Sequence, residues 1–517
     1  HNSVLRPLYE LEEKGVSVTI VDCEKNGTIS CEKIQQAIGK KTKAIVCTHA
    51  SNVTGDGNDI AQIGTLCEKY NLYFILDASQ TAGTIEIDME QNHISAICFT
   101  GHKGLFGPQG TGGIALADGV CVRPLLSGGS GVHSFERKHP MELPAALEAG
   151  TLNGHGIAGL HAALDWIKKT GIAAIHEKEM ALAEQFQRGI ETIPGIHLYG
   201  GEKRVAAIVS CNLADLDSAY VSDCLAEDYG IATRAGAHCA PLMHTHFGTE
   251  KQGMVRFSFS CFNTTEEVEK AVRAMQDIAA ENRGKVTAYV GAGGKTSAIR
   301  KRAETMRTEG KKVLILTTTK MMVPQEQEIF AAYEQTGQES VILDTGAVSK
   351  ECRAAEKQLK ERVQSVLDTY GCCVAGSLIP GTEKFGMLLE KLMEDLLYLA
   401  DEILIEADGS AHMPVKAPAE HEPVLFPYMD EVVIVMGAHA IGKPLQEVCH
   451  RADYAKKILK CDADKIVTAT DIRVLAEQGY AIPIQKQFPW MKISKVTGKD
   501  IKLCLTAEKK DKERDKQ

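Results

Sequence analysis

Hydrophobic and polar positions alternate in two ways along the first hundred residues. Short apolar runs rich in β-branched residues predict strands at 16–21, 44–48, 72–77 and 96–100. Between the second and third run, Ile60, Ile63, Leu66 and Cys67 recur at helical spacing, and Asp59 occupies the expected N-cap position. This alternation of strands and helices predicts an α/β fold with a largely parallel sheet.

A second pattern of the same kind begins after a polar break at 281–285. A strand predicted at 286–290 leads into a glycine-rich turn and a helical stretch. Further strands are predicted at 313–317, 403–406, 432–436 and 465–468. We therefore expect one α/β domain over 1–281 and a second over 285–506. The charged run 507–517 is expected to be a solvated or disordered tail.

Composition limits the classes of protein that the chain can belong to. Its 517 residues, 44% hydrophobic and 24% charged, are typical of a soluble globular protein with more than one domain. A formal charge of -10 argues against a general nucleic-acid binder. Neither a membrane-spanning apolar run nor a signal-peptide pattern is found in the sequence. The 16 cysteines form no paired zinc motif, so most are expected to be small core residues in a reducing cytoplasm.

The first candidate for chemistry is Lys103, which follows a predicted strand and begins a glycine-rich turn. A lysine amine is nucleophilic when neutral and can form a Schiff base. Asp77 ends another apolar strand, and a buried carboxylate there needs a partner such as the pyridinium nitrogen of pyridoxal phosphate (PLP). Alternatively, Lys103 is a surface lysine and Asp77 a helix N-cap. The order of Asp77, Gln80 and Lys103 favours a PLP site.

Several stretches in this order resemble the class V aminotransferase family, and within it the cysteine desulfurase and selenocysteine lyase group. The matching stretches are 1–3, 48–55, 77–80, 101–103, 150–153, 234–239 and 256–258. The resemblance implies a PLP fold-type I domain, similar to aspartate aminotransferase. It also implies further residues before His1, with a glycine/threonine phosphate-binding turn, so we expect this chain, which does not begin with methionine, to be a fragment.

The resemblance implies cofactor contacts for five residues. Lys103 would form the Schiff base, and Asp77 would pair with the pyridine nitrogen. Gln80 would contact the phenolic oxygen of PLP. His1 would stack on the ring, and Asn52 would lie beside both cofactor and substrate.

The resemblance also implies how phosphate and substrate are held. Thr100 and His102 would help to bind the cofactor phosphate. Thr151 would reach the phosphate of the neighbouring subunit, which implies a homodimer. Arg256 would bind the substrate carboxylate, a task suited to a bidentate guanidinium.

Cys239 completes the chemistry that the resemblance implies. Its thiolate would attack the sulfur or selenium of L-cysteine or L-selenocysteine, leaving alanine and a persulfide for an acceptor protein. A nearby cation or His238 would assist the thiolate. Alternatively, Cys239 is a small buried hydrophobic residue, but its position between Gly236 and Pro241, in a predicted loop, disfavours this.

A second constellation follows the strand at 286–290. Gly291, Gly293 and Gly294 precede Lys295 and Thr296, as in a short phosphate-binding loop. Glycines let backbone N–H groups approach phosphates, Lys295 would reach the terminal phosphates, and Thr296 would bind Mg²⁺. The spacing is two residues shorter than in GxxxxGK[ST], so a plain glycine-rich strand–helix turn is the alternative.

Glu406 and Asp408 follow another apolar strand and are candidates for holding Mg²⁺ or its water shell. This half of the chain resembles the YqeC-type accessory proteins of selenium-dependent molybdenum hydroxylases. The matching stretches are 290–296, 317–321, 406–410, 415–423, 442–445 and 450–451. The resemblance implies a P-loop-like α/β domain that binds ATP or GTP and acts in selenium cofactor maturation.

Together the two halves predict an enzyme that mobilises sulfur or selenium, fused to a nucleotide-binding maturation factor. Two alternatives remain. The first domain is a non-catalytic remnant on a nucleotide-dependent binding factor, or it is a plain class V aminotransferase that makes no use of Cys239. The stretch at 234–239 argues against the second alternative.

Overall fold

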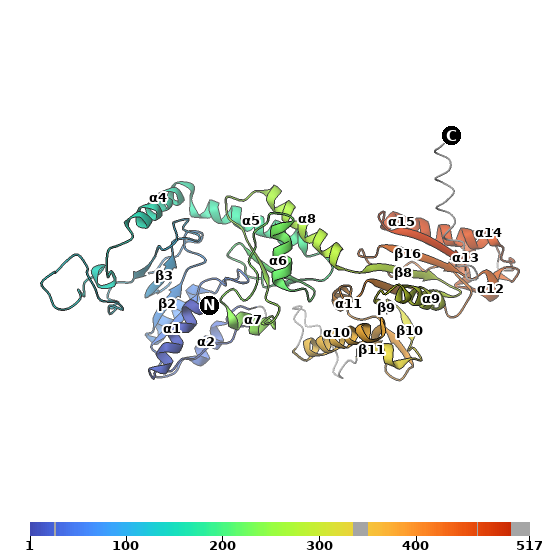
Figure 1. Cartoon of the computed structure of the whole chain (residues 1–517), viewed down its shortest axis with the longest axis horizontal. Coiled ribbons are helices and arrows are strands. Elements are labelled where there is room, and N and C mark those ends of the chain that lie inside the picture. Colours follow the sequence, from blue (N-terminus) through green and yellow to red (C-terminus); the bar gives the residue numbers. More distant parts are fainter. Residues whose placement is uncertain (25–26, 334–349, 463, 498–517) are drawn as a thin grey trace. The chain divides into compact units, whose positions relative to one another are not determined.

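The computed structural model describes residues 1–24, 27–333, 350–462 and 464–497 (Figure 1). The chain divides into two compact units, His1–Ile278 and Ala279–Gln517. The division falls within helix α8, Thr265–Asn282. Each unit has its own sheets and its own hydrophobic core.

The first unit contains two sheets. In the four-stranded sheet, β1, β2 and β3 are parallel and β4 runs antiparallel to β3; the three-stranded sheet of β5, β6 and β7 is antiparallel. The strands are β1 (Ala44–Thr48), β2 (Tyr73–Asp77), β3 (Ala96–Thr100), β4 (Gly112–Leu116), β5 (Ile196–Tyr199), β6 (Ile208–Leu213) and β7 (Val255–Ser258). The other helices are α1 (Asn2–Glu13), α2 (Cys31–Ala37), α3 (Ile60–Tyr70), α4 (Gly154–Thr170), α5 (Ile172–Ile190), α6 (Ser218–Glu227) and α7 (Pro241–Phe247).

Most of the elements predicted for this unit are confirmed. The predicted strands coincide with β1 and β3, and β2 begins one residue later than predicted. Helix α3 begins after Asp59, whose Oδ1 accepts a hydrogen bond from the Gln62 amide at 2.9 Å. The strand predicted at 16–21 is wrong. Val16 and Ile20 are 49% and 45% exposed, and within the described part of the chain no strand pairs with this run, although Val21 at its end packs against the core.

The second unit is built on a nine-stranded sheet. Its central strands are parallel and follow the order β12-β9-β14-β8-β16-β18. The strands of this unit are β8 (Lys285–Gly291), β9 (Val313–Thr317), β10 (Lys320–Met322), β11 (Phe330–Tyr333), β12 (Cys372–Leu378), β13 (Lys384–Gly386), β14 (Glu402–Glu406), β15 (Val415–Lys416), β16 (Glu431–Met436), β17 (Cys449–His450) and β18 (Lys492–Thr497).

Helices cover both faces of this sheet. Helix α9 packs its buried side chains on one face, and helices α10, α11 and α13 to α15 contribute to the core on the other face. The helices are α9 (Lys295–Thr308), α10 (Lys350–Tyr370), α11 (Glu390–Leu396), α12 (Leu445–Val448), α13 (Ala452–Leu459), α14 (Ala469–Val474) and α15 (Ile482–Gln487), with a π-helical segment at Leu475–Ala481. Burial on two faces explains why the central strands are continuous apolar runs.

The sequence predicts four of these strands, β8, β9, β14 and β16, to within one residue at each end. The strand predicted at 465–468 is wrong, because only an isolated bridge from Ile466 to Pro444 forms there and Ile466 is 50% exposed. The charged run 507–517 lies outside the described residues. Among the described helices, none is both long and apolar enough to cross a membrane.

Candidate functional site

Lys103 lies in a tight turn just after β3. The turn is closed by a hydrogen bond from the Phe106 amide to the Lys103 carbonyl at 2.8 Å. The lysine side chain is half-buried. Burial lowers the pKa of its amine, and the charges of Arg256 and Arg234 lower it further, while Asp77 and Cys239 act in the opposite direction. A lowered pKa increases the neutral, nucleophilic fraction of the amine.

Asp77 ends β2, the strand next to β3, and is 8% exposed. Its Oδ1 accepts hydrogen bonds from the Ser79 amide at 3.0 Å and from the Ser79 hydroxyl at 2.6 Å. Its Oδ2 has only a long contact, 3.5 Å, with the hydroxyl of Ser3. Oδ2 can therefore accept a further strong hydrogen bond. A buried carboxylate with one free acceptor, close to a lysine of lowered pKa, fits the pyridinium nitrogen of PLP.

The N-terminal helix α1 adjoins the same carboxylate. The ring Nδ1 of His1 lies 2.8 Å from the Ser3 hydroxyl and accepts from the Ser3 amide, so His1 caps the helix. The Asn2 amide donates to the Cys239 carbonyl at 2.8 Å. The helix thus brings His1 to the region shared by Asp77 and Cys239.

Cys239 lies on an exposed turn, which we call the nucleophile loop and define as residues 234–240. His238 and Cys239 have φ values of 52° and 56°, a left-handed conformation that is costly for two consecutive residues with side chains. The Asn52 side-chain amide donates to the His238 carbonyl at 2.7 Å. Together with the bond from Asn2, this contact holds the backbone on both sides of the Cys239 α-carbon.

Two arginines flank the nucleophile loop. Arg234 and Arg256 pair through their backbones in an antiparallel bridge. The Arg256 guanidinium donates to the Asn52 carbonyl at 3.0 Å, but its buried Nε has no hydrogen-bond partner among the described residues. The same guanidinium forms no ion pair with a described carboxylate, and burial lowers the pKa of Arg256. Arg256 is therefore available to an anionic ligand.

The Cys239 thiol has one of these arginines as a neighbour. A guanidinium nitrogen of Arg234 lies 3.9 Å from the Cys239 Sγ. His238 is 2% exposed and its ring faces inward, with Nε2 3.0 Å from the Arg234 carbonyl. Burial is the main reason that the pKa of His238 falls to about 4, so the ring is neutral at physiological pH. Arg234 is therefore a cation beside the sulfur, whereas the His238 ring is neutral and bonded to other groups; assistance of the thiolate by either residue stays a prediction.

Four of the predicted site residues make no side-chain hydrogen bond to any described residue. Gln80 and Thr100 are half-buried near Asp77 and at the end of β3, whereas His102 and Thr151 are exposed. The structure therefore brings Lys103, Asp77 and Cys239 together with Arg256, Asn52 and His1. It leaves the proposed phosphate contacts of Thr100, His102 and Thr151 as predictions.

In the second unit, the loop after β8 begins helix α9. Gly291, Gly293 and Gly294 have φ values of 93°, 80° and 129°, which residues with side chains rarely adopt. No side chain caps the helix at Gly294, and a Cβ on Gly294 would meet open space. The first amides of α9 are therefore open to an anion.

Lys295 is the first residue of α9 and is only 3% exposed. Its Nζ donates to the Gly291 carbonyl at 2.7 Å and lies 3.1 Å from Asp408 Oδ1. The Thr296 hydroxyl donates to Glu406 Oε2 at 3.0 Å. Burial raises the pKa of Glu406, and Asp408 raises it too, although Lys295, Thr296 and His412 oppose this. The strand order explains why Thr296 lies beside Glu406: β14, which ends at Glu406, pairs with β8, which leads into the glycine-rich loop.

Asp408 is fully buried at the centre of a charge network. Its Oδ2 accepts from the Gly291 amide at 3.0 Å and from the Tyr480 hydroxyl at 2.9 Å, and lies 3.3 Å from Lys416 Nζ. Lys416 is also fully buried, and its Nζ forms a second ion pair with Glu422 Oε2 at 2.6 Å. These contacts occupy Oδ2, whereas the buried Oδ1 has no hydrogen-bond partner among the described residues and lies beside the charged Lys295, so Mg²⁺ binding by Asp408 stays a prediction. No cluster of three or more metal-binding side chains occurs among the described residues.

Comparison with known proteins assigns both halves. The model of the family "Aminotransferase class-V" matches residues 1–271, more than half of the chain. The chain belongs to the class-V aminotransferase family. A probable cysteine desulfurase of Methanothermobacter thermautotrophicus is 33% identical over 54% of this chain and 71% of its own length. A cysteine desulfurase of Shigella flexneri is 30% identical over 51% of this chain and 65% of its own length.

Structural comparison agrees with this class-V assignment. The apo structure of a cysteine desulfurase from Thermococcus onnurineus matches with a TM-score of 0.51 and 29% identity, over 54% of this chain and 71% of that one. The match supports a PLP fold-type I architecture for the first unit. A second family model, "YqeC protein", matches residues 287–453, so the chain is a fusion of a class-V aminotransferase domain with a YqeC domain.

The sequence of this class-V fusion protein did not single out three residues that the structure places at the two candidate sites. Arg234 lies within a matched motif, but nothing in the sequence pairs it with Cys239. Lys416 had a usable signal, because a lysine within a buried apolar strand needs a carboxylate partner. Tyr480 comes from the π-helical segment beyond the YqeC match and has no local signal.

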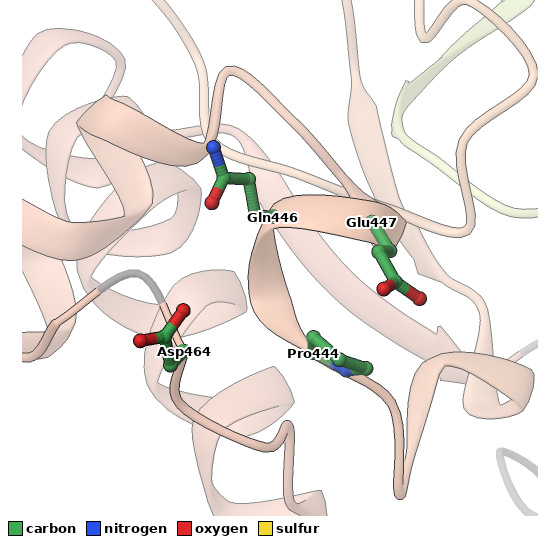
Figure 2. A pocket seen from close by; sticks show the side chains of 4 residues that line it. All are labelled: Pro444, Gln446, Glu447 and Asp464. Atoms are coloured by element: carbon green, nitrogen blue, oxygen red, sulfur yellow. The ribbon is translucent and has the colours of Figure 1, made fainter.

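A cavity of about 380 Å³ in the YqeC half is lined by Pro444, Gln446, Glu447 and Asp464. Figure 2 shows that Asp464 comes from a different segment than the other three residues. None of the four is a predicted site residue, and their mixture of two carboxylates, an amide and a proline carries no recognisable chemistry.

Proposed function

We propose that the class-V unit uses PLP to remove sulfur or selenium from L-cysteine or L-selenocysteine. The products are alanine and a persulfide or selenosulfide on Cys239. The observation that carries the proposal is the convergence of Lys103, Asp77, Arg256 and Cys239. The charges of Asp77, Arg256 and Cys239 all act on the pKa of Lys103.

Each of these residues has a distinct task. Arg256, with its unpartnered Nε, binds the substrate carboxylate. Asp77 holds the protonated ring nitrogen of PLP, which supplies an electron sink when bound. Lys103, whose pKa is lowered, anchors the cofactor as a neutral amine and then moves protons at the substrate α-carbon.

Cys239 supplies the sulfur-accepting step. Its thiolate forms a bond to the sulfur or selenium of the substrate, and the carbon–sulfur or carbon–selenium bond breaks. The carbon keeps the electron pair of that bond and takes up a proton, which leaves alanine. The terminal sulfur or selenium atom then passes to an acceptor protein. The exposure of Cys239 on its turn supports such a transfer, because an acceptor must reach the sulfur.

The class-V unit is also proposed to act as a homodimer. Large apolar side chains of the segment around residues 121–152 are highly exposed; they include Leu125 at 92%, Leu126 at 69% and Met141 at 63%. Large exposed apolar side chains gathered in one segment are a feature of surfaces that a partner covers. Thr151 belongs to the same segment, which supports its proposed contact with the partner's cofactor phosphate.

For the second unit we propose binding of ATP or GTP with Mg²⁺. The open amides of α9 and the buried Lys295 support phosphate binding, and the pair of Thr296 and Glu406 supports Mg²⁺ binding. Because this unit is a YqeC domain, the fusion would couple the released sulfur or selenium to maturation of selenium-dependent molybdenum hydroxylases.

Alanine release from cysteine and from selenocysteine, with PLP and a thiol reductant added, tests the first proposal. We expect release by the full chain and its loss in Lys103→Ala and Cys239→Ser. Retained release in Cys239→Ser would overturn the sulfur-transfer mechanism. Amino-group transfer to a keto acid that is independent of Cys239 would identify a plain aminotransferase. Absence of PLP binding would identify a non-catalytic remnant.

Equilibrium binding of ATP and GTP to the full chain tests the second proposal. Thr296→Val removes the hydroxyl, whereas Thr296→Ser keeps it. We expect Mg²⁺ to strengthen binding to the parent and to Thr296→Ser but not to Thr296→Val. Lys295→Met should weaken binding with or without Mg²⁺. Equal affinities for all four proteins would overturn nucleotide binding at this loop.

A further inference from the structure

Three buried polar side chains that the proposed reaction does not use form a row that begins within the nucleophile loop. His238, His244 and Thr249 are 2%, 1% and 4% exposed. His238 Nδ1 lies 3.3 Å from His244 Nε2, and His244 Nδ1 lies 2.9 Å from the Thr249 hydroxyl. At the other end, His238 Nε2 lies 3.0 Å from the Arg234 carbonyl. Buried polar groups usually form hydrogen bonds with one another. In this case the hydrogen bonds also connect the nucleophile loop with the residues that follow helix α7.

The chemistry of the partners fixes the direction of these hydrogen bonds. A carbonyl only accepts, so His238 Nε2 carries the proton that it donates to Arg234. Because burial keeps His238 neutral, its Nδ1 must accept from His244 Nε2. Burial also lowers the pKa of His244, although a backbone hydrogen bond with Thr249 and the charge of Glu250 raise it. With Nε2 donating to His238, the Nδ1 of a neutral His244 ring accepts from the Thr249 hydroxyl. The three side chains form one directed chain from the Thr249 hydroxyl to the Arg234 carbonyl.

The chain ends where the nucleophile loop begins. The Arg234 carbonyl also accepts from the Arg256 amide at 2.9 Å, so it joins the loop to β7. Thr249 lies just beyond helix α7, which the loop enters at Pro241. The row of side chains therefore ties the start of the loop to the far end of the following helix. Between these points His238 and Cys239 keep left-handed conformations that need support from their surroundings.

We infer that Thr249, His244 and His238 are positioning residues, which hold the Arg234 carbonyl through a directed hydrogen-bond chain and thereby fix the turn that presents Cys239. The functional part of this inference rests on the proposed role of Cys239. None of the three side chains needs to touch substrate. Their effect passes through the backbone of the nucleophile loop and through Arg234, whose guanidinium lies beside the sulfur.

Matched variants separate this role from simple packing. Thr249→Val replaces the hydroxyl with a methyl group of similar size, whereas Thr249→Ser keeps the hydroxyl. His244→Leu removes both ring nitrogens, whereas His244→Gln keeps an N–H donor near the Nε2 position. If hydrogen bonding positions the loop, Ser and Gln preserve function better than Val and Leu, although Val and Leu fill the buried sites.

Hydrogen–deuterium exchange of residues 234–240, followed by mass spectrometry of the full chain with PLP, tests the inference without turnover. We expect exchange about fivefold faster in Thr249→Val and His244→Leu, and within about twofold of the parent in Thr249→Ser and His244→Gln. In alanine release, the first pair should lose kcat by about the same factor with little change in KM, because Arg256 is untouched.

Two results would overturn the inference. One is parent-like exchange in Thr249→Val and His244→Leu; the other is equal perturbation by all four variants. A parent chain that releases no alanine while exchange still sorts the variants as expected would defeat the proposed function and leave the positioning chain standing.

Discussion

The guanidinium of Arg234 lies 3.9 Å from the sulfur of Cys239, on the same exposed loop. An adjacent cation stabilises the negative charge of a thiolate, the form of cysteine that reacts. Both side chains are exposed, so the interaction is screened by water and salt. Its effect should be modest but measurable.

The first prediction concerns this pair. Alkylation of Cys239 by iodoacetamide at neutral pH should be about twofold to fivefold slower in Arg234→Gln than in the parent, and intermediate or unchanged in Arg234→Lys. Peptide mass spectrometry measures the rate, and the exposed Cys121 in the same sample is an internal reference. The difference should shrink at high ionic strength. Equal alkylation rates in Arg234→Gln and the parent would show that Arg234 does not activate the thiol.

The second prediction concerns acid stability of the class-V unit. His49 is 7% exposed, its Nδ1 lies 2.9 Å from the Thr81 hydroxyl, and burial lowers its pKa from 6.5 to about 4. Unfolded chains bind a proton at His49 below pH 6.5, and the folded unit does not until about pH 4. Stability due to the neutral ring is therefore lost as the pH falls between these values. The parent should lose about 2 kcal/mol more than His49→Gln between pH 7 and pH 5.

Urea unfolding followed by Trp166 fluorescence, in a Trp490→Phe background, measures this difference. Other groups titrate over the same range; for instance, burial raises the pKa of Glu179 to about 7, which opposes the loss. These contributions are common to both proteins and cancel. His161→Gln, at an exposed position, should behave like the parent. The prediction fails if His49→Gln has the same pH dependence as the parent.

The third prediction concerns the charge network of the YqeC unit. Asp408→Asn leaves Lys295 and Lys416 buried without their shared carboxylate, and should destabilise the unit by about 3–5 kcal/mol. As a control, Asp368→Asn breaks an exposed pair with Lys312 and should leave the stability of the unit nearly unchanged. Trp490 fluorescence during urea unfolding, in a Trp166→Phe background, reports on this unit. Similar losses in both variants would mean that the network adds no more than a surface ion pair.

The sequence predicts the elements of this fold where its periodicity reflects burial. Strands β9 and β14 follow directly from apolar runs that the sheet buries. The run at 16–21 has a similar pattern but remains mostly exposed, because a strand also needs a neighbouring strand to pair with, and local sequence does not show one. The stretch 465–468 fails for the same reason.

Some residues of the candidate site can likewise be predicted from the sequence, and others cannot. Lys103, Asp77 and Cys239 are recognisable because each belongs to a motif with a chemical role. His244 and Thr249 carry no such signal. Their significance depends on which nitrogen faces which neighbour, and that is decided only when α7 folds back along the nucleophile loop.

The left-handed pair at the tip of the nucleophile loop has a practical consequence for protein engineering. A β-branched side chain at 238 or 239 would clash with its own backbone at these φ values, whatever its chemistry. Serine or asparagine tolerates the conformation far better than valine or threonine. Libraries that diversify the sulfur-accepting position should therefore be filtered by backbone compatibility before activity is compared, because otherwise lost function would reflect a distorted turn and not a missing thiol.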